Sequence, residues 1–162
     1  MNMKPERFLL WIALGLLAVA CRRSDTAPAI SDPGKNELSW LTDFETAKAK
    51  ARAENKTLFI NFTGSDWCPP CIMLHRQVFS QPEFAEYAAK HLVLMEVDFP
   101  RHKEQSAEQR AANEKVADQF QIEGFPTVIV LDSQGKKLGD RGYMPGGPKP
   151  FLAALDKLRA DQ

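Results

Sequence analysis

The sequence predicts one α/β domain over residues 37–162, with a mixed central sheet of four to five strands and helices on both faces. First, strand-like apolar runs alternate with helical segments along most of the chain, which is typical of parallel strands joined by crossover helices. Second, the last two strand-like runs flank the turn Asp132–Gly135, which indicates a hairpin. Third, 44% of the 162 residues are hydrophobic, enough for one packed core.

Residues 39–55 are expected to form the first helix, because Phe44, Ala47 and Ala51 recur at helical spacing. Residues 57–63 are expected to follow as a strand, since this run is mostly apolar and β-branched, as in buried strands. The fold is therefore expected to begin with a helix and then a strand.

Two helices are expected before the next strand. The first, residues 69–78, begins with two prolines, which a first helical turn tolerates because the N–H there lacks an intrahelical partner. The second, residues 80–90, begins with a capping serine and acidic support. Residues 92–98 then form a mostly buried strand.

The second half of the chain is expected to contain the hairpin and two further helices. Residues 99–109 are highly charged and are expected to form a polar crossing, followed by a helix over residues 111–120. Residues 127–131 and 136–143 are the two strands of the hairpin. Residues 151–159 form the closing helix, with leucines on one side.

Two cysteines lie between the strand and the helix that follows it, in the run Trp67-Cys68-Pro69-Pro70-Cys71. A CxxC pair in this position favours thiol–disulfide exchange. Thiolate is the reactive form of cysteine, and the N-terminus of a helix stabilises an anion. Cys68 is therefore the expected nucleophile. Cys71 lies one turn deeper and is expected to resolve the mixed disulfide.

The Pro-Pro spacer is expected to keep this pair reducing, because it removes both intervening N–H donors that could have stabilised a thiolate. No metal site is expected, since a zinc site usually adds a second cysteine pair at similar spacing and the sequence has none. His75 is near Cys71 in sequence but is expected on an ordinary helix face. A permanent structural disulfide is disfavoured, because so small a ring removes little entropy from the unfolded chain.

Charge and cysteine content exclude several classes of protein. With 21 basic and 21 acidic residues, the chain has neither a basic field for nucleic acid nor an acidic tail. Three cysteines are an odd number, so pairing Cys68 with Cys71 leaves Cys21. A framework of structural disulfides is therefore excluded.

Residues 1–20 have the features of a signal peptide. Lys4 and Arg7 form a basic start, and residues 8–20 are an uncharged apolar stretch that ends in small residues. This stretch of 13 residues is too short to span a hydrocarbon core comfortably, which takes about 20 residues. We therefore expect export across the inner membrane.

Cys21 ends the run Leu17-Ala18-Val19-Ala20-Cys21, which resembles a bacterial lipobox, although Ala18 stands where leucine is usual. The favoured interpretation is lipidation of Cys21. Residues 21–36, rich in proline and small residues, would then form a flexible tether. Ordinary cleavage near Ala20 and a short uncleaved anchor remain alternatives.

A second motif, Gly124-Phe125-Pro126-Thr127, precedes the β-branched strand of the hairpin. Together with the tryptophan-flanked CxxC pair, it resembles the thioredoxin family. That resemblance implies a thioredoxin fold and a cis Pro126 beside the cysteines. It also implies that Trp67, Phe125, Pro126 and Thr127 shape the substrate groove. The alternative for Pro126 is a proline at the start of an edge strand.

Two further stretches, residues 62–68 and 78–84, are similar to exported thioredoxin-like proteins with a thiol:disulfide interchange role. The resemblance extends over about residues 38–160. It implies that the chain acts on protein disulfides and needs neither a metal nor an organic cofactor.

Three polar residues are candidate modulators of the cysteines. Cytoplasmic thioredoxins carry a buried aspartate that helps move the proton of the second cysteine, and Asn61 takes its place here. The lysine that partners this aspartate is replaced by Leu94. Glu96 lies on the same strand face as Leu94 and is a candidate substitute. Asp66 is expected to be an exposed loop acid.

These features predict an exported thiol–disulfide oxidoreductase on the periplasmic side, lipid-anchored to a bacterial membrane, and most favourably a reductase of substrate protein disulfides. Its expected partners are exported proteins with disulfides, a membrane electron donor that recharges the pair, and the membrane itself. No nucleic acid is expected, and the chain is expected to be a monomer. One alternative is an oxidase or isomerase that donates or reshuffles disulfides. Another is a noncatalytic client-binding module.

Overall fold

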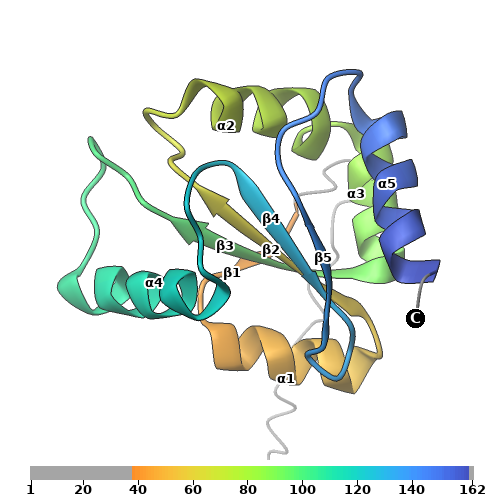
Figure 1. Cartoon of the computed structure of the whole chain (residues 1–162), viewed down its shortest axis with the longest axis horizontal. Coiled ribbons are helices and arrows are strands. Elements are labelled where there is room, and N and C mark those ends of the chain that lie inside the picture. The colour runs from red at the N-terminus through yellow and green to blue at the C-terminus, as the bar shows by residue number, and fades with distance from the viewer. Residues whose placement is uncertain (1–37, 161–162) are drawn as a thin grey trace, which may run out of the picture. The chain divides into compact units, whose positions relative to one another are not determined.

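The computed structural model describes residues 38–160 and has the predicted α/β architecture (Figure 1). One mixed sheet contains five strands in the order β1-β3-β2-β4-β5. The elements, in chain order, are β1 Trp40–Leu41, α1 Phe44–Glu54, β2 Thr57–Thr63, α2 Pro69–Leu74, the π-helical turn η1 His75–Phe79, α3 Pro82–His91, β3 Leu92–Asp98, α4 Ala107–Phe120, β4 Thr127–Leu131, β5 Lys137–Arg141 and α5 Pro148–Ala160.

Strand directions in the sheet follow from the way the strands are connected. β3 runs parallel to both β1 and β2. Helix α1 joins β1 to β2, and α2, η1 and α3 join β2 to β3. β4 is antiparallel to β2 and to its hairpin partner β5. β4 is thus an interior strand, so the alternative that Pro126 opens an edge strand is wrong. The register between β2 and β3 places Asn61 directly beside Glu96.

Two layers of helices cover the sheet, with α2, α3 and α5 on one face and α1 and α4 on the other (Figure 1). β2 serves both layers, because every one of its seven residues is buried and successive side chains point to opposite faces. Phe59 packs in the core below α2, α3 and α5, whereas Ile60 and Phe62 pack in the core against α1 and α4. This buried strand leads directly into the CxxC motif.

The first helix begins five residues later than the sequence predicts. Asp43 has extended backbone angles and its carboxylate accepts a hydrogen bond from the backbone N–H of Thr46 at 2.8 Å, so the helix begins at Phe44. Trp40 and Leu41 instead pair with β3 as an edge strand. A strand of two residues is too short for an alternating pattern to reveal it.

Helix α4 begins at Ala107, inside the segment predicted to be a polar crossing. The Ser106 hydroxyl accepts a hydrogen bond from the backbone N–H of Gln109 at 3.1 Å. A serine followed three residues later by glutamine is the sequence pattern of a capping box, which would have located this start. The crossing is therefore shorter than expected and ends at Gln105.

No helix among residues 38–160 has the length and apolar character needed to cross a membrane. The expected signal peptide, Cys21 and the whole of the expected tether lie outside the described residues.

Candidate active site

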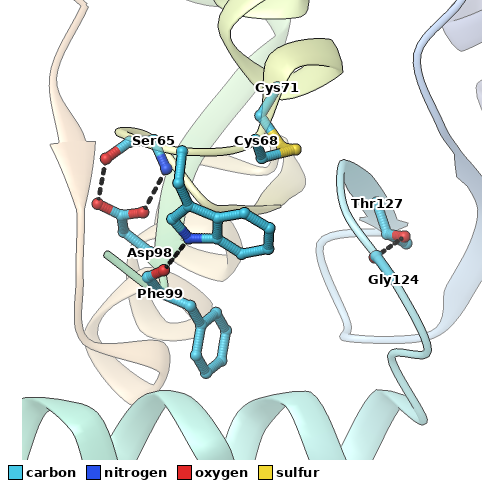
Figure 2. The surroundings of a disulfide bond; sticks show 8 residues. Ser65, Cys68, Cys71, Asp98, Phe99, Gly124 and Thr127 are labelled. Atoms are coloured by element: carbon cyan, nitrogen blue, oxygen red, sulfur yellow. Dashed lines mark hydrogen bonds between the residues drawn. A yellow bond between two sulfur atoms is a disulfide. The ribbon is translucent and has the colours of Figure 1, made fainter. Parts of the chain in front are cut away.

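Cys68 and Cys71 are joined in a disulfide at the start of α2 (Figure 2). Cys68 is the N-cap residue of the helix, and the two prolines of the spacer occupy its first turn. Cys71 follows one turn along, with a Cα–Cα separation from Cys68 of 5.3 Å. In this oxidised state the two residues are only 3% and 4% exposed. The predicted pair is thus assembled at a helix N-terminus.

The turn between β2 and α2 depends on Gly64. A Cβ atom at this position would lie 2.5 Å from the Trp67 indole, so only glycine fits without moving that ring. The Gly64 carbonyl accepts hydrogen bonds from the backbone N–H groups of Trp67 and Cys68, at 3.2 and 2.9 Å. The turn therefore places Trp67 directly beside the first cysteine.

Trp67 is held on three sides. Its indole Nε1 donates a hydrogen bond to the Phe99 carbonyl at 2.7 Å. The Phe125 ring packs against the indole with an interplanar angle of 77°, and the Arg101 guanidinium lies 3.6 Å from the indole ring centroid, a cation–π contact. This side chain is consequently fixed before any client arrives.

The Phe125–Pro126 peptide bond is cis, in agreement with the resemblance. Just beyond it, the Thr127 hydroxyl donates a hydrogen bond to the Gly124 carbonyl at 2.8 Å (Figure 2). Phe125 stacks on Phe99 with ring centroids 5.1 Å apart. Phe125 therefore joins the Pro126 segment to the aromatic groups beside Cys68.

Phe99 is a site residue that sequence reasoning missed, because it was assigned to the polar crossing. It contacts the site through both its carbonyl and its ring. An aromatic residue directly after a buried strand was the available signal, since the end of β3 lies beside the end of β2 that leads to the cysteines.

Asp66 fixes the loop after β3 to the CxxC motif. Its carboxylate accepts hydrogen bonds from the backbone N–H groups of Arg101, His102 and Lys103 at 3.0, 2.8 and 2.9 Å. These bonds, first of all that from Arg101, lower the pKa of Asp66 below its usual value. Asp66 is therefore an anchor for residues 101–103, a role that its place in the sequence did not reveal.

Asp98, at the end of β3, anchors the turn between β2 and α2 through Ser65. Its carboxylate accepts hydrogen bonds from the backbone N–H and the hydroxyl of Ser65, at 2.9 and 2.5 Å (Figure 2). Lys103 Nζ donates to the same hydroxyl at 3.0 Å. The sequence alone gives no signal for this pair, since a serine in a loop and an aspartate at the end of a strand are both common.

A pocket of ≈ 280 Å³ lies behind Cys71, and Asn61 and Glu96 both line it. The pKa of Glu96 is raised, mainly because burial disfavours its charged form and secondly because Asp98 lies nearby. The Asn61 Oδ1 atom is buried and has no hydrogen-bond partner among the described residues. The structure thus places two of the three predicted modulators in a pocket that the second cysteine also lines, and Asp66 is not among its lining residues.

Comparisons with known proteins agree with this geometry. Residues 44–159 match the family model of the thioredoxin-like domain. Disulfide bond reductase DsbH of Chlamydia pneumoniae is 35% identical over 118 residues, which cover 73% of this chain and 70% of that protein. The solved structure of a DsbH oxidoreductase matches with a TM-score of 0.72 and 33% identity, over 77% of this chain and 86% of the solved one.

Longer relatives match over only part of their length. Thiol:disulfide interchange protein DsbD of Pseudoalteromonas atlantica is 30% identical over 117 residues, which are 70% of this chain but 18% of that protein. The oxidised C-terminal domain of Neisseria meningitidis DsbD has a TM-score of 0.52 at 17% identity, over 71% of this chain and 91% of the solved one. At that identity the likeness concerns the fold alone.

Proposed function

The chain belongs to the thioredoxin-like domain family, and we propose that within this family it is an exported reductase of protein disulfides. It is a protein-disulfide oxidoreductase with a redox-active CxxC pair. The observation that carries the proposal is the Cys68–Cys71 disulfide at the start of α2, beside the cis Pro126 segment.

Two observations favour reduction as the direction. The chain is similar over most of its length to a protein named as a disulfide bond reductase. The spacer consists of Pro69 and Pro70, which offer no backbone N–H to a thiolate on Cys68. Less stabilisation of the thiolate favours the disulfide form and makes the dithiol a better reductant. We therefore expect a reduction potential of about −270 mV, as in thioredoxin, rather than the value of about −120 mV that is typical of strong oxidants.

In the proposed reaction the Cys68 thiolate attacks one sulfur of a client disulfide. The client S–S bond breaks, one client thiolate leaves, and Cys68 is joined to the client in a mixed disulfide. Cys71 then loses its proton and attacks the Cys68 sulfur, which releases the second client thiolate and restores the Cys68–Cys71 disulfide. Two electrons pass from the protein to the client, so an external dithiol must recharge the pair.

Glu96 is the group we propose to accept the proton of Cys71, because both residues line the pocket behind the disulfide. Asn61 is its register neighbour on β2, and this amide partly offsets the rise in the pKa of Glu96. Trp67, Phe125, Pro126 and Thr127 are proposed to form the groove that receives the extended client segment. Such a segment would present its sulfur to Cys68.

Export and lipidation at Cys21 are part of the proposal and rest on the sequence of residues 1–21. A periplasmic reductase needs a source of electrons, and the proposed source is a membrane-embedded dithiol donor. The similarity to one segment of DsbD proteins fits a place in such an exchange chain.

The function is tested by following the reduction of insulin with wild type and with Cys68→Ser. The variant should lose at least about 100-fold in rate, because it lacks the nucleophile. A Cys71→Ser variant should instead trap the client on Cys68, and the trapped protein can be identified. Equal rates for wild type and Cys68→Ser would eliminate the proposal.

A further inference from the structure

The pocket behind Cys71 has a rim of exposed positive charge. Arg76, from the turn after α2, and Lys103, from the loop after β3, both line it and are both exposed. They come from different segments that meet at the second cysteine. His75 lines the same rim and is also exposed.

Within residues 38–160, no carboxylate forms an ion pair with Arg76, Arg101 or Lys103, whereas five other pairs are formed on the surface. Two of the acids close to them are occupied elsewhere. Asp66 accepts backbone N–H groups, and Asp98 accepts two hydrogen bonds from Ser65.

Two of these cations, Arg101 and Lys103, are also held in place. Asp66 fixes the backbone of residues 101–103, Lys103 Nζ donates to Ser65 Oγ at 3.0 Å, and the Arg101 guanidinium rests 3.6 Å from the centroid of the Trp67 ring. A preorganised charge loses less conformational freedom when it binds a ligand. The loop after β3 therefore presents one fixed cation, Lys103, at the pocket and a second, Arg101, over the Trp67 ring.

An apolar side chain completes the surface. Ile72 follows Cys71, lines the pocket and is 45% exposed, which makes it the one large hydrophobic side chain counted as exposed among the described residues. It can contact the aliphatic part of a client side chain whose end group reaches the cations. Glu96 also lines the pocket, and its charged form opposes an incoming anion.

We propose that Arg76 and Lys103 recognise carboxylate side chains next to the reactive cysteine of a polypeptide client, with Arg101 adding to the same positive field. Acidic segments around a disulfide would then be preferred substrates. This inference deepens the proposed function and rests on it. Glu104, an exposed acid next to Lys103, opposes the preference.

The test uses the reduced full chain and two disulfide-bonded peptides of equal length, with either glutamate or glutamine on both sides of each cysteine. The glutamate peptide should be reduced about fivefold faster in about 0.01 M salt, because exposed ion pairs each contribute little. The difference should vanish in about 1 M salt, where the Debye length is only ~3 Å.

Arg76→Glu and Lys103→Gln should each lower the ratio of the two rates. Lys136→Glu is the matched control, since Lys136 is an exposed cation in the β4–β5 turn outside this pocket, and it should keep the wild-type ratio. Equal rates for the two peptides with wild type would overturn the inference and leave the proposed function standing. The inference would also be overturned if wild type preferred the glutamate peptide and neither Arg76→Glu nor Lys103→Gln changed that preference. If neither peptide is reduced, the proposed function and this inference both fail.

Discussion

Glu96 is a half-buried carboxylate behind a reactive cysteine, and its position has a cost for stability. Free glutamate titrates near 4.5, and burial together with Asp98 raises the pKa of Glu96 in the folded protein. Between these two values the unfolded state binds fewer protons than the folded state, so the free energy of unfolding falls as pH rises. At neutral pH the charged form of Glu96 thus destabilises the fold.

We predict that Glu96→Gln raises the melting temperature at pH 7 and that this gain shrinks toward pH 4, where wild type carries the proton. The same variant should resolve the mixed disulfide at least about tenfold more slowly, because it lacks the proton acceptor. Thermal unfolding at several pH values and acid-quenched single-turnover assays measure the two effects.

The control is Glu114→Gln, which removes an exposed glutamate of α4 and should change neither quantity. Adding Asn61→Asp to Glu96→Gln should restore part of the rate, since Asn61 lines the same pocket. A mixed disulfide that Glu96→Gln resolves at the wild-type rate would show that Glu96 has no part in the proton transfer.

At the scale of elements, the turn between β2 and α2 depends on close packing against Trp67. We predict that Gly64→Ala displaces the indole and lowers stability by about 1–3 kcal/mol, as overpacking typically does. Tryptophan fluorescence and denaturant unfolding measure the two effects.

Gly124→Ala is the matched substitution, because a Cβ at Gly124 would meet no atom within 4 Å. It lies in the other motif of the site and should leave fluorescence unchanged. Unaltered fluorescence and stability in Gly64→Ala would mean that the turn tolerates a side chain and that Trp67 is less fixed than its contacts indicate.

The sequence could predict those strands and motifs that their own residues reveal, without knowledge of the segments they pair with. The strands β2, β3 and β4 were predicted because each is a mostly apolar run of strand length, and the CxxC pair was found because its spacing alone is informative. The strand β1 could not be found, since only its pairing with β3 makes Trp40–Leu41 a strand.

The site was predictable where chemistry is carried by side chains and was missed where backbone groups act. Cys68, Cys71 and Pro126 could be named from the sequence. The contacts of Phe99 and Asp66 could not. The Phe99 carbonyl meets an indole 32 residues away in sequence, and the Asp66 carboxylate meets a backbone N–H group 35 residues away.

At the scale of the whole molecule, Phe59 connects much of the core on one face of the sheet. Its ring packs against four other aromatic rings, those of Trp40, Phe79, Phe84 and Phe151. These residues come from β1, η1, α3 and α5. Three helical segments and the edge strand thus meet at one fully buried side chain.

We predict that Phe59→Ala costs about 3–5 kcal/mol, a large part of the 5–15 kcal/mol that typically stabilises a domain. Phe59→Leu should cost clearly less because it fills most of the same volume. Chemical denaturation measures both. As a control, Ile72→Ala should be nearly neutral for stability because Ile72 is 45% exposed. A loss of less than about 1 kcal/mol in Phe59→Ala would contradict the central position of this ring.

The way Asp66 fixes residues 101–103 has an evolutionary consequence. The anchoring bonds go to main-chain amides, which every residue except proline supplies, so the course of the loop does not depend on which side chains it carries. Residues 101–103 can therefore be substituted while the conformation of the loop and the thiol–disulfide exchange at the cysteines stay the same. Related domains could diverge in client choice by exchanging this tripeptide, and an engineer could retarget the protein in the same way.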